Sequence, residues 1–319
     1  MKTKILSLIV LCALALTVRV RGAEGGLTHY LSGEYLDFCG MPPTQSGLYA
    51  ANYFMAYANA QINASKELPL GGILAAGIKA NMQGEVPVVI YAYPFSVADI
   101  TFSSGIGVPW VWADLKAQAT FTRDQIQISG QRQQSANGLG DIQVMPIMAG
   151  WTNGDFKLGG MVNVWAPSGT YSPNQLVNPG LGYWTFEPML AFSWLSTKIG
   201  TEFSIFSGLD FNTQNNTTDY QSGDLFHVDA SLAQHLPVFG GVAGLGASAF
   251  YMRQFTGDSG SGARLGTFDL LSYGVGPTLS YAHPIGKSML VADASWLPQL
   301  NTQNTLKGSY IWFKVSVAF

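Results

Sequence analysis

The C-terminal end of the chain alternates between apolar and polar residues with a period of two. One face of its last nine residues carries Ile311, Phe313, Val315, Val317 and Phe319, and the other carries Trp312, Lys314, Ser316 and Ala318. Successive side chains of a strand point to opposite faces, so this segment predicts a strand with one apolar face. An exposed apolar edge strand aggregates in water, whereas the closing strand of an outer-membrane barrel faces lipid. A buried last strand of a soluble β-sandwich is the alternative.

Four internal segments repeat this pattern, at residues 183–194, 198–211, 225–235 and 271–281. Their apolar faces carry large aromatic and aliphatic residues, such as Trp184 and Phe203. In all four segments the charged residues lie only on the polar face, which holds Glu187, Lys198, Glu202 and Asp229. Lipid on the outside and a polar interior produce this distribution in a transmembrane barrel. A half-exposed sheet of a soluble protein would show it as well.

Shorter alternating or apolar runs predict nine further strands, separated by turn residues as in an antiparallel meander. They lie at 47–59, 85–95, 99–108, 110–121, 141–152, 157–166, 240–253, 288–297 and 307–319. The total of thirteen is odd, while single-chain bacterial barrels have even numbers, so one strand within 47–121 is excess or missing. We predict an all-β transmembrane antiparallel barrel of twelve strands, with fourteen as the alternative. Polar stretches at 122–140, 167–180 and 211–224 are predicted as the longer, extracellular loops.

The N-terminal region divides into an export signal and an irregular leader. Lys2 and Lys4 precede an apolar run and a small-residue cleavage site at Gly22 and Ala23, which predicts a signal peptide over residues 1–23. Residues 24–46 lack alternation and contain Pro42 and Pro43, so we predict a periplasmic segment or a plug of the barrel lumen. The barrel itself is expected over residues 47–319.

The composition agrees with an exported membrane barrel. The chain is 47% hydrophobic and 11% charged, against a usual charged fraction of about 25%, and no apolar run after the signal is long enough for a membrane helix. Removing the four basic residues of the signal from the 16 Lys and Arg leaves 12 basic against 19 acidic residues, so the mature chain carries −7. This charge argues against nucleic acid as a partner.

Three patterns resemble chemical sites without completing one. Residues 257–260 (GDSG) look like the loop of a serine protease nucleophile, but the four histidines stand in no matching context. Residues 241–246 match a dinucleotide-binding loop poorly. His227, Asp229 and His235 share a polar face, but their spacing along one strand is too wide for one ion. We therefore predict no catalytic residues, no metal and no cofactor.

Several motifs, in order along residues 45–319, resemble one known family. They are Gly138–Ile142, Pro146, Trp151, Pro167–Tyr171, Asn178–Gly180, Tyr183–Pro188, Tyr220–Asp224, Gln254–Gly260 and Gly276–Pro277. This set resembles the family called "putative MetA-pathway of phenol degradation". The resemblance implies an outer-membrane channel of bacteria that degrade aromatic compounds, similar to but distinct from the long-chain fatty-acid transporter superfamily. It implies passive passage of small hydrophobic molecules, and it supplies no substrate-binding residues.

The pattern and the resemblance together give a set of expected roles. Candidate residues of the lumen and substrate path are Met161, Trp165, Glu187, Lys198, Glu202, His227, Asp229, Tyr310, Trp312 and Lys314. For the charged members, a salt-bridge network that stiffens the wall is the alternative role. The apolar face ending at Phe319 is the expected signal for the barrel-assembly machinery. Expected partners are small hydrophobic or aromatic substrates, lipid and lipopolysaccharide, with the protein a monomer in the outer membrane of a Gram-negative bacterium.

Two other functions remain open on the sequence. An outer-membrane lipid hydrolase would need a serine, a histidine and an acid at the rim of the barrel. A structural or adhesive barrel would have a lumen closed by side chains.

Overall fold

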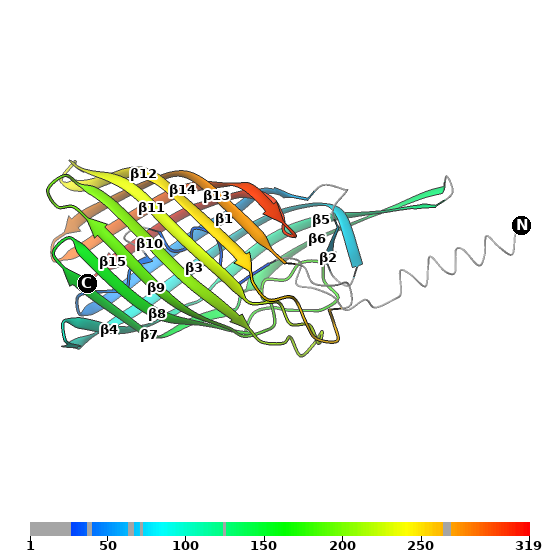
Figure 1. Ribbon diagram of the computed structural model, residues 1–319, viewed down its shortest axis with the longest axis horizontal. Helices are drawn as coiled ribbons and strands as arrows, with labels where there is room; N and C mark the ends of the chain where they lie inside the picture. The colour runs from blue at the N-terminus through cyan, green and yellow to red at the C-terminus, as the bar shows by residue number, and fades with distance from the viewer. Residues whose placement is uncertain (1–26, 37–39, 63–66, 71–72, 124–125, 264–268) are drawn as a thin grey trace, which may run out of the picture.

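The protein is a closed antiparallel β-barrel that encloses part of its own N-terminal region (Figure 1). The computed structural model describes residues 27–36, 40–62, 67–70, 73–123, 126–263 and 269–319. The expected signal peptide, residues 1–23, lies outside the described residues.

Twelve strands form the ring, and each pairs with two neighbours. They are β1 (Gly47–Gln61), β3 (Ile73–Val97), β4 (Ile100–Gly107), β7 (Ile142–Asn153), β8 (Phe156–Ala166), β9 (Thr185–Leu195), β10 (Thr201–Asn212), β11 (Leu225–Val238), β12 (Gly241–Gln254), β13 (Leu271–Ile285), β14 (Ser288–Gln303) and β15 (Lys307–Ala318). The ring closes where β1 pairs with β15 on one side and with β3 on the other. The expectation of a twelve-stranded barrel is therefore confirmed.

Three further strands lie outside the ring: β2 (Glu67–Leu70), β5 (Trp110–Arg123) and β6 (Ile126–Leu139). The long strand β3 explains them, because its second half pairs with β4 while its first half pairs with β2 and β5. The strand predicted at 110–121 exists as β5, but it continues the wall above β4 and adds no position to the ring. This accounts for the odd number of thirteen predicted strands.

The prediction of a loop over residues 122–140 is wrong. Residues 126–139 form β6, which pairs with β5 along its whole length. Figure 1 shows this β5–β6 hairpin reaching far past the end of the barrel. Its polar sequence gave no alternation because exposed residues occur on both faces, including Arg132, Gln133 and Ser135.

The outer surface of the ring is apolar and the inner surface is mixed. Large outward side chains include Leu190 (73% exposed), Leu245 (68%) and Phe313 (52%), while their strand neighbours Met189 and Trp312 are buried. A closed barrel with an apolar outer belt leaves no unpaired strand edge in lipid, which is the requirement for spanning a membrane with strands. The protein is therefore a barrel of the Gram-negative outer membrane.

None of the described residues form a helix that is long and apolar enough to cross a membrane.

The two ends of the barrel differ in the length of their connections. One end has the short turns at 154–155, 239–240 and 286–287 together with the C-terminus, and the other has the long connections at 167–184, 213–224 and 255–270. In bacterial barrels the short turns face the periplasm and the long loops face outwards. The loops predicted at 167–180 and 211–224 lie at the long-loop end.

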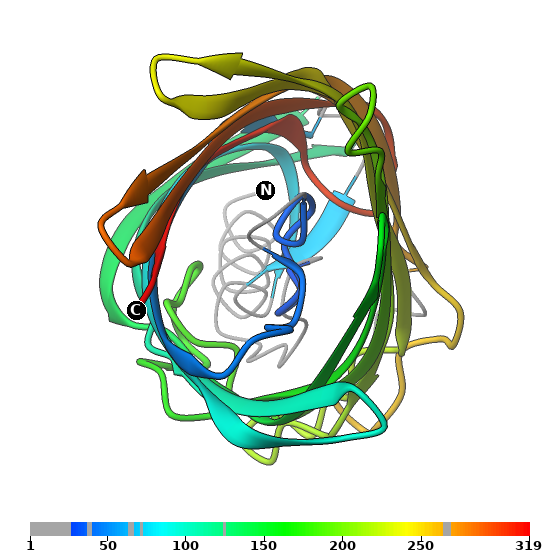
Figure 2. The same cartoon turned by 90° about the vertical axis from the view of Figure 1, so that its left-hand side faces the viewer.

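Residues 27–36 and 40–46 lie inside the ring, as the view along the barrel axis shows in blue (Figure 2). We call them the lumen segment. Its first residues contact the wall near the long-loop end, and Pro42 and Pro43 contact Gly150 and Gly159 near the periplasmic end. A Cβ atom on Gly150 would lie 2.4 Å from the carbonyl oxygen of Pro43. The wall thus uses small residues where the segment passes most closely.

Candidate functional site

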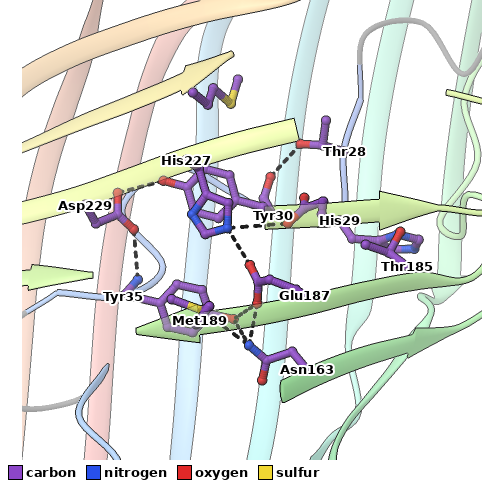
Figure 3. Close-up of polar contacts among 12 residues, drawn as sticks. Thr28, His29, Tyr30, Tyr35, Asn163, Thr185, Glu187, Met189, His227 and Asp229 are labelled. Carbon is purple, nitrogen blue, oxygen red and sulfur yellow. Dashed lines mark hydrogen bonds and ion pairs between the residues drawn. The ribbon is translucent and has the colours of Figure 1, made fainter. Parts of the chain in front are cut away.

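Asp229 on β11 is the main acceptor for the lumen segment. Its carboxylate accepts hydrogen bonds from the Tyr30 hydroxyl at 2.7 Å, from the Gly33 backbone N–H at 3.0 Å and from the Tyr35 backbone N–H at 3.2 Å (Figure 3). Burial and then the charge of Asp229 raise the pKa of Tyr30, so its hydroxyl keeps the proton that it donates. Three donors on one buried carboxylate fix the turn at residues 30–35 against the wall.

A second set of contacts comes from β15, on the face opposite to lipid. The Lys314 ammonium group donates to the carbonyl oxygens of Gly33 at 2.8 Å and Glu34 at 2.7 Å. The indole N–H of Trp312 donates to the carbonyl oxygen of Ser32 at 2.9 Å. The alternation of the terminal strand therefore serves two surfaces, because Phe313 faces lipid while its neighbours hold the segment.

A buried polar cluster lies on β9–β11 beneath Tyr30. The His227 ring stacks on the Tyr30 ring with centroids 3.7 Å apart, and its Nε2 atom lies 2.6 Å from Oε1 of Glu187. The other oxygen of Glu187 accepts hydrogen bonds from the Tyr35 hydroxyl at 3.3 Å and from the amide of Asn163 (Figure 3). The segment and the wall thus share one hydrogen-bonded network across the lumen.

A further cluster ties the start of the lumen segment to the long-loop end. His29 contacts Asp141 through Nε2 at 2.9 Å and Thr185 through Nδ1 at 2.7 Å. Asp141 also accepts the backbone N–H groups of Gly169 and Leu181, so it fastens the 167–184 loop as well. Burial raises the pKa of Asp141, but the hydrogen bond and charge of His29 outweigh it and hold that pKa below its usual value.

The pKa of Glu34, in the lumen segment, is also perturbed. Burial, followed by the negative charge of Glu187, raises its pKa from 4.5 to about 8, although the Lys314 charge opposes the rise. Near neutral pH the carboxyl is therefore mainly protonated. A neutral Glu34 can donate a hydrogen bond into the space beside it.

Between the lumen segment and the wall lies a cavity of about 110 Å³. Its apolar lining includes Leu31, Met55, Val86, Trp165 and Trp312, and its polar lining includes Glu34 and Gln143. A smaller cavity of about 30 Å³ shares Glu34, Tyr53 and Gln143 with it and continues toward Met145, Met148 and Met161. Apolar spaces of this order, ~150 Å³ in an engineered core, accept a molecule as large as benzene.

Nine of the ten residues expected on the substrate path are buried on the inner side of the barrel strands. They are Met161, Trp165, Glu187, Glu202, His227, Asp229, Tyr310, Trp312 and Lys314. Trp165 and Trp312 line the larger cavity, and Met161 lines the smaller one.

Lys198 does not belong to this set. It is exposed in the turn between β9 and β10, because β10 begins at Thr201 and the chain reverses at Gly200 with a φ of +73°. The predicted strand 198–211 was thus three residues too long at its start.

The sequence did not single out several residues that complete the site. These residues contact the residues above across 17 to 199 positions of the chain, and they are Tyr30, Tyr35, Asn163, Asp141 and Asp210. Glu187 was placed correctly on a polar face, but the periodicity of one strand carries no information about which residues of a neighbouring strand it meets.

Comparison with known proteins gives the family and the fold. The model of the family described as "Putative MetA-pathway of phenol degradation" matches residues 63–315. The solved COG4313 outer membrane channel from Pseudomonas putida F1 has a TM-score of 0.66 at 11% identity and covers 91% of this chain and 100% of that chain. At this identity the likeness shows the shared fold. A search of curated proteins finds no match.

Two further solved barrels are less similar. The β domain of the Bordetella autotransporter BrkA has a TM-score of 0.48 at 11% identity, covering 86% of this chain and 100% of that one. A Pseudomonas aeruginosa FadL homologue has a TM-score of 0.42 at 7% identity, covering 86% and 90%. The family model matches most of the chain, so the protein belongs to the family described as "Putative MetA-pathway of phenol degradation".

Proposed function

We propose that the barrel is a channel for passive uptake of small hydrophobic or aromatic compounds across the outer membrane. The observation that supports this most is the larger cavity, which lies inside the barrel and is bordered by Trp165 and Trp312. An apolar solute entering such a space gains about 25 cal/mol for each Å² of surface removed from water. A water-filled pore offers no comparable free energy of binding.

The two cavities supply weak sites in series, which a passage needs so that a solute can both enter and leave. Glu34, Tyr53 and Gln143 border both of them. An aromatic compound with one polar group fits this lining, because neutral Glu34 and Gln143 can both donate and accept hydrogen bonds.

The lumen segment is the proposed gate of this path. It lies inside the ring, where Asp229 and Lys314 hold it through polar contacts and Tyr30, Tyr35 and Leu36 pack into the apolar clusters of the wall. The strand pairings that close the ring do not include these contacts, so the segment can leave its position without unfolding the barrel.

The lipid hydrolase has weaker support. A hydroxyl, an imidazole and a carboxylate do meet at Thr185, His29 and Asp141. The Thr185 hydroxyl, however, donates to Asn212 at 2.7 Å and is fully buried. Toward His29 it is thus an acceptor, and it does not face the rim where a lipid ester would arrive.

The closed structural barrel is distinguished by direct measurement. Purified protein in liposomes should take up a small aromatic compound faster than protein-free liposomes, and Trp165→Ala should weaken binding of that compound to the protein. Phe239→Ala, a substitution of a fully exposed turn residue (92%), is the control. Uptake equal to that of protein-free liposomes would leave the closed barrel as the better account.

A further inference from the structure

Three buried side chains with metal-ligating atoms converge on the inner wall: Glu187 of β9, Asp210 of β10 and His227 of β11. The Nε2 atom of His227 lies 2.6 Å from Oε1 of Glu187 and 3.4 Å from Oδ1 of Asp210. All three ligand atoms lie within 4.8 Å of one another, and all three side chains are at most 2% exposed.

The charges of this trio do not balance while both carboxylates are ionised. Oδ1 of Asp210 has no hydrogen-bond donor among the described residues. Two carboxylates and one doubly protonated imidazole still leave a net charge of −1, which is costly in a buried position. The nearby Lys314 ammonium donates to the carbonyl oxygens of Gly33 and Glu34 instead. A divalent cation with a neutral imidazole would bring the trio to zero.

The surroundings orient the ligands for such an ion. Gly208 of β10 pairs with His227, and a Cβ atom there would lie 2.3 Å from Nε2, so glycine leaves the room that the imidazole occupies. Tyr30 stacks on the ring. Asn163 and Tyr35 bind Oε2 of Glu187 and leave Oε1 directed at His227. Partners of this kind behind the ligands fix their orientation in metal sites.

We propose that Glu187, Asp210 and His227 bind one divalent cation of the zinc type. Zinc accepts imidazole nitrogen and carboxylate oxygen at about 2.0–2.2 Å, which sets tetrahedral ligand atoms roughly 3.4 Å apart. The Nε2–Oδ1 distance already has this value, and the Nε2–Oε1 distance has to widen by less than ~1 Å. The three ligands leave a fourth position open. The ion would join three neighbouring strands at the place where Tyr30 and Tyr35 dock.

This site differs from the one considered on the sequence, which combined His227 with Asp229 and His235. Asp229 is directed at the lumen segment. His235 pairs with Glu202 at 2.6 Å, the same distance as between His227 and Glu187, and both of these pairs are buried. Among the described residues, the three-ligand group found includes His227 and does not include His235. Glu202 is therefore a matched control.

The test uses full-length mature protein refolded from urea into detergent micelles, because Tyr30 covers the site in the folded barrel. Refolding is done with Zn²⁺, with Co²⁺ or with EDTA, followed by gel filtration and determination of metal per folded barrel. We expect about one ion per chain for wild type and for Glu202→Gln, with the intense visible absorption of four-coordinate Co²⁺. Glu187→Gln and Asp210→Asn should retain less than a fifth of that amount.

Wild-type protein that folds without retaining either metal would overturn the site, and protons would then balance the charge. Equal metal in Asp210→Asn and Glu202→Gln would overturn it as well. Heat-modifiable gel migration reports folding of each variant. If neither ligand variant folds, the metal content and the cobalt spectrum of the wild-type protein decide whether the site binds an ion. The result does not depend on transport, so it is distinct from any test of the channel.

Discussion

At the scale of single residues, the inner wall is organised around buried carboxylates that accept hydrogen bonds from the lumen segment. Asp229 holds three donors of the segment, and Asp141 holds His29 together with two backbone groups of a loop. Because each carboxylate is shared by elements far apart in the sequence, removing one charge should loosen the segment while the strand ladder stays intact.

Asp229→Asn should release the lumen segment more often. The asparagine amide keeps one acceptor oxygen but loses the negative charge, and a hydrogen bond to a charged group contributes about 2 kcal/mol. Loss of this free energy corresponds to a ~30-fold rise in the population in which the lumen segment has left the wall. The open population can be measured as the rate at which a thiol reagent labels the Ser32→Cys variant. Ser32 is fully buried, so the reagent reaches this position only when the segment opens. Cys39→Ser removes the other cysteine of the mature chain.

Glu202→Gln is the control for this experiment. Glu202 is a buried carboxylate on the inner side of β10, and it accepts hydrogen bonds from Ser193 and Ser204 and pairs with His235, all on wall strands. It should leave the labelling rate near that of the wild type. Equal rates for both variants would show that Asp229 does not hold the segment.

Glu34 should make docking of the segment depend on pH. The docked pKa of about 8 lies above the ordinary value of 4.5, so the docked state binds more protons, and docking weakens as pH rises from 4.5 to about 8 and then stays constant. The charged groups that act on it are Glu187, Asp229 and Lys314. Openings in planar bilayers should become more frequent across this range, and Glu34→Gln should remove most of the change. A wild-type profile that is flat, or that falls with pH, would contradict this.

The sequence was sufficient to predict on which side of the wall a residue lies, but not which residues it contacts. Glu187, His227 and Lys314 were placed inside correctly, because alternation assigns faces one strand at a time. Tyr30 and Tyr35 were missed, since an irregular segment has no period and its contacts depend on the closed ring. Lys198 was misplaced because a turn residue can extend an alternating pattern by chance.

At the scale of elements, the alternation of apolar and polar residues predicted some strands well and missed others. Strands with one lipid face and one inner face, such as β9 and β10, were found within a few residues of their bounds. The strand predicted at 110–121 corresponds to β5, whereas the polar sequence of β6 was read as a loop. Residues 73–84, the first half of β3, were not among the predicted strands, and there β3 pairs with β5 instead of β4.

Leu190 tests the lipid face of β9. It is 73% exposed near the middle of the strand, so Leu190→Arg places a charge in the hydrocarbon region. We expect a loss of about 2–4 kcal/mol in the free energy of unfolding, measured by urea titration in lipid vesicles. Phe239→Arg, in an exposed turn, should cost no more than ~1 kcal/mol, as for positions near the interface. Similar losses at both positions would place the lipid belt elsewhere.

The last strand also tests the proposed assembly signal. Phe319 is 65% exposed, and its backbone N–H donates to the carbonyl oxygen of Leu48, which Phe319→Ala keeps. This variant should reduce the amount of heat-modifiable barrel in the outer membrane several-fold. Purified Phe319→Ala should nevertheless refold in detergent as the wild type does. If the amount of folded barrel in the outer membrane is unchanged, Phe319 is not part of the assembly signal.

At the scale of the whole molecule, the barrel is a closed wall around a segment of its own chain (Figure 2). The ring provides passage through the membrane only if the segment leaves space, and the cavity beside Trp165 and Trp312 is where that space begins. The twelve-stranded ring was predictable from alternation and parity. A plug over residues 24–46 was one of two alternatives, and alternation could not choose between them. The choice depends on contacts of the lumen segment with distant strands such as β8, β11 and β15.

The most direct test locks the lumen segment in place and measures uptake of a small aromatic compound by proteoliposomes. Ser32 Oγ lies 3.6 Å from Met252 Sδ of β12, so these two side chains are in contact. Cysteines at both positions, in a Cys39→Ser background, can therefore be joined by a short bifunctional thiol reagent. We predict that the untreated variant takes up the compound like the wild type, and that the cross-linked variant falls to the level of protein-free liposomes. Equal uptake with and without the cross-link would contradict the role of the segment, and wild-type uptake no faster than that of protein-free liposomes would contradict the channel itself.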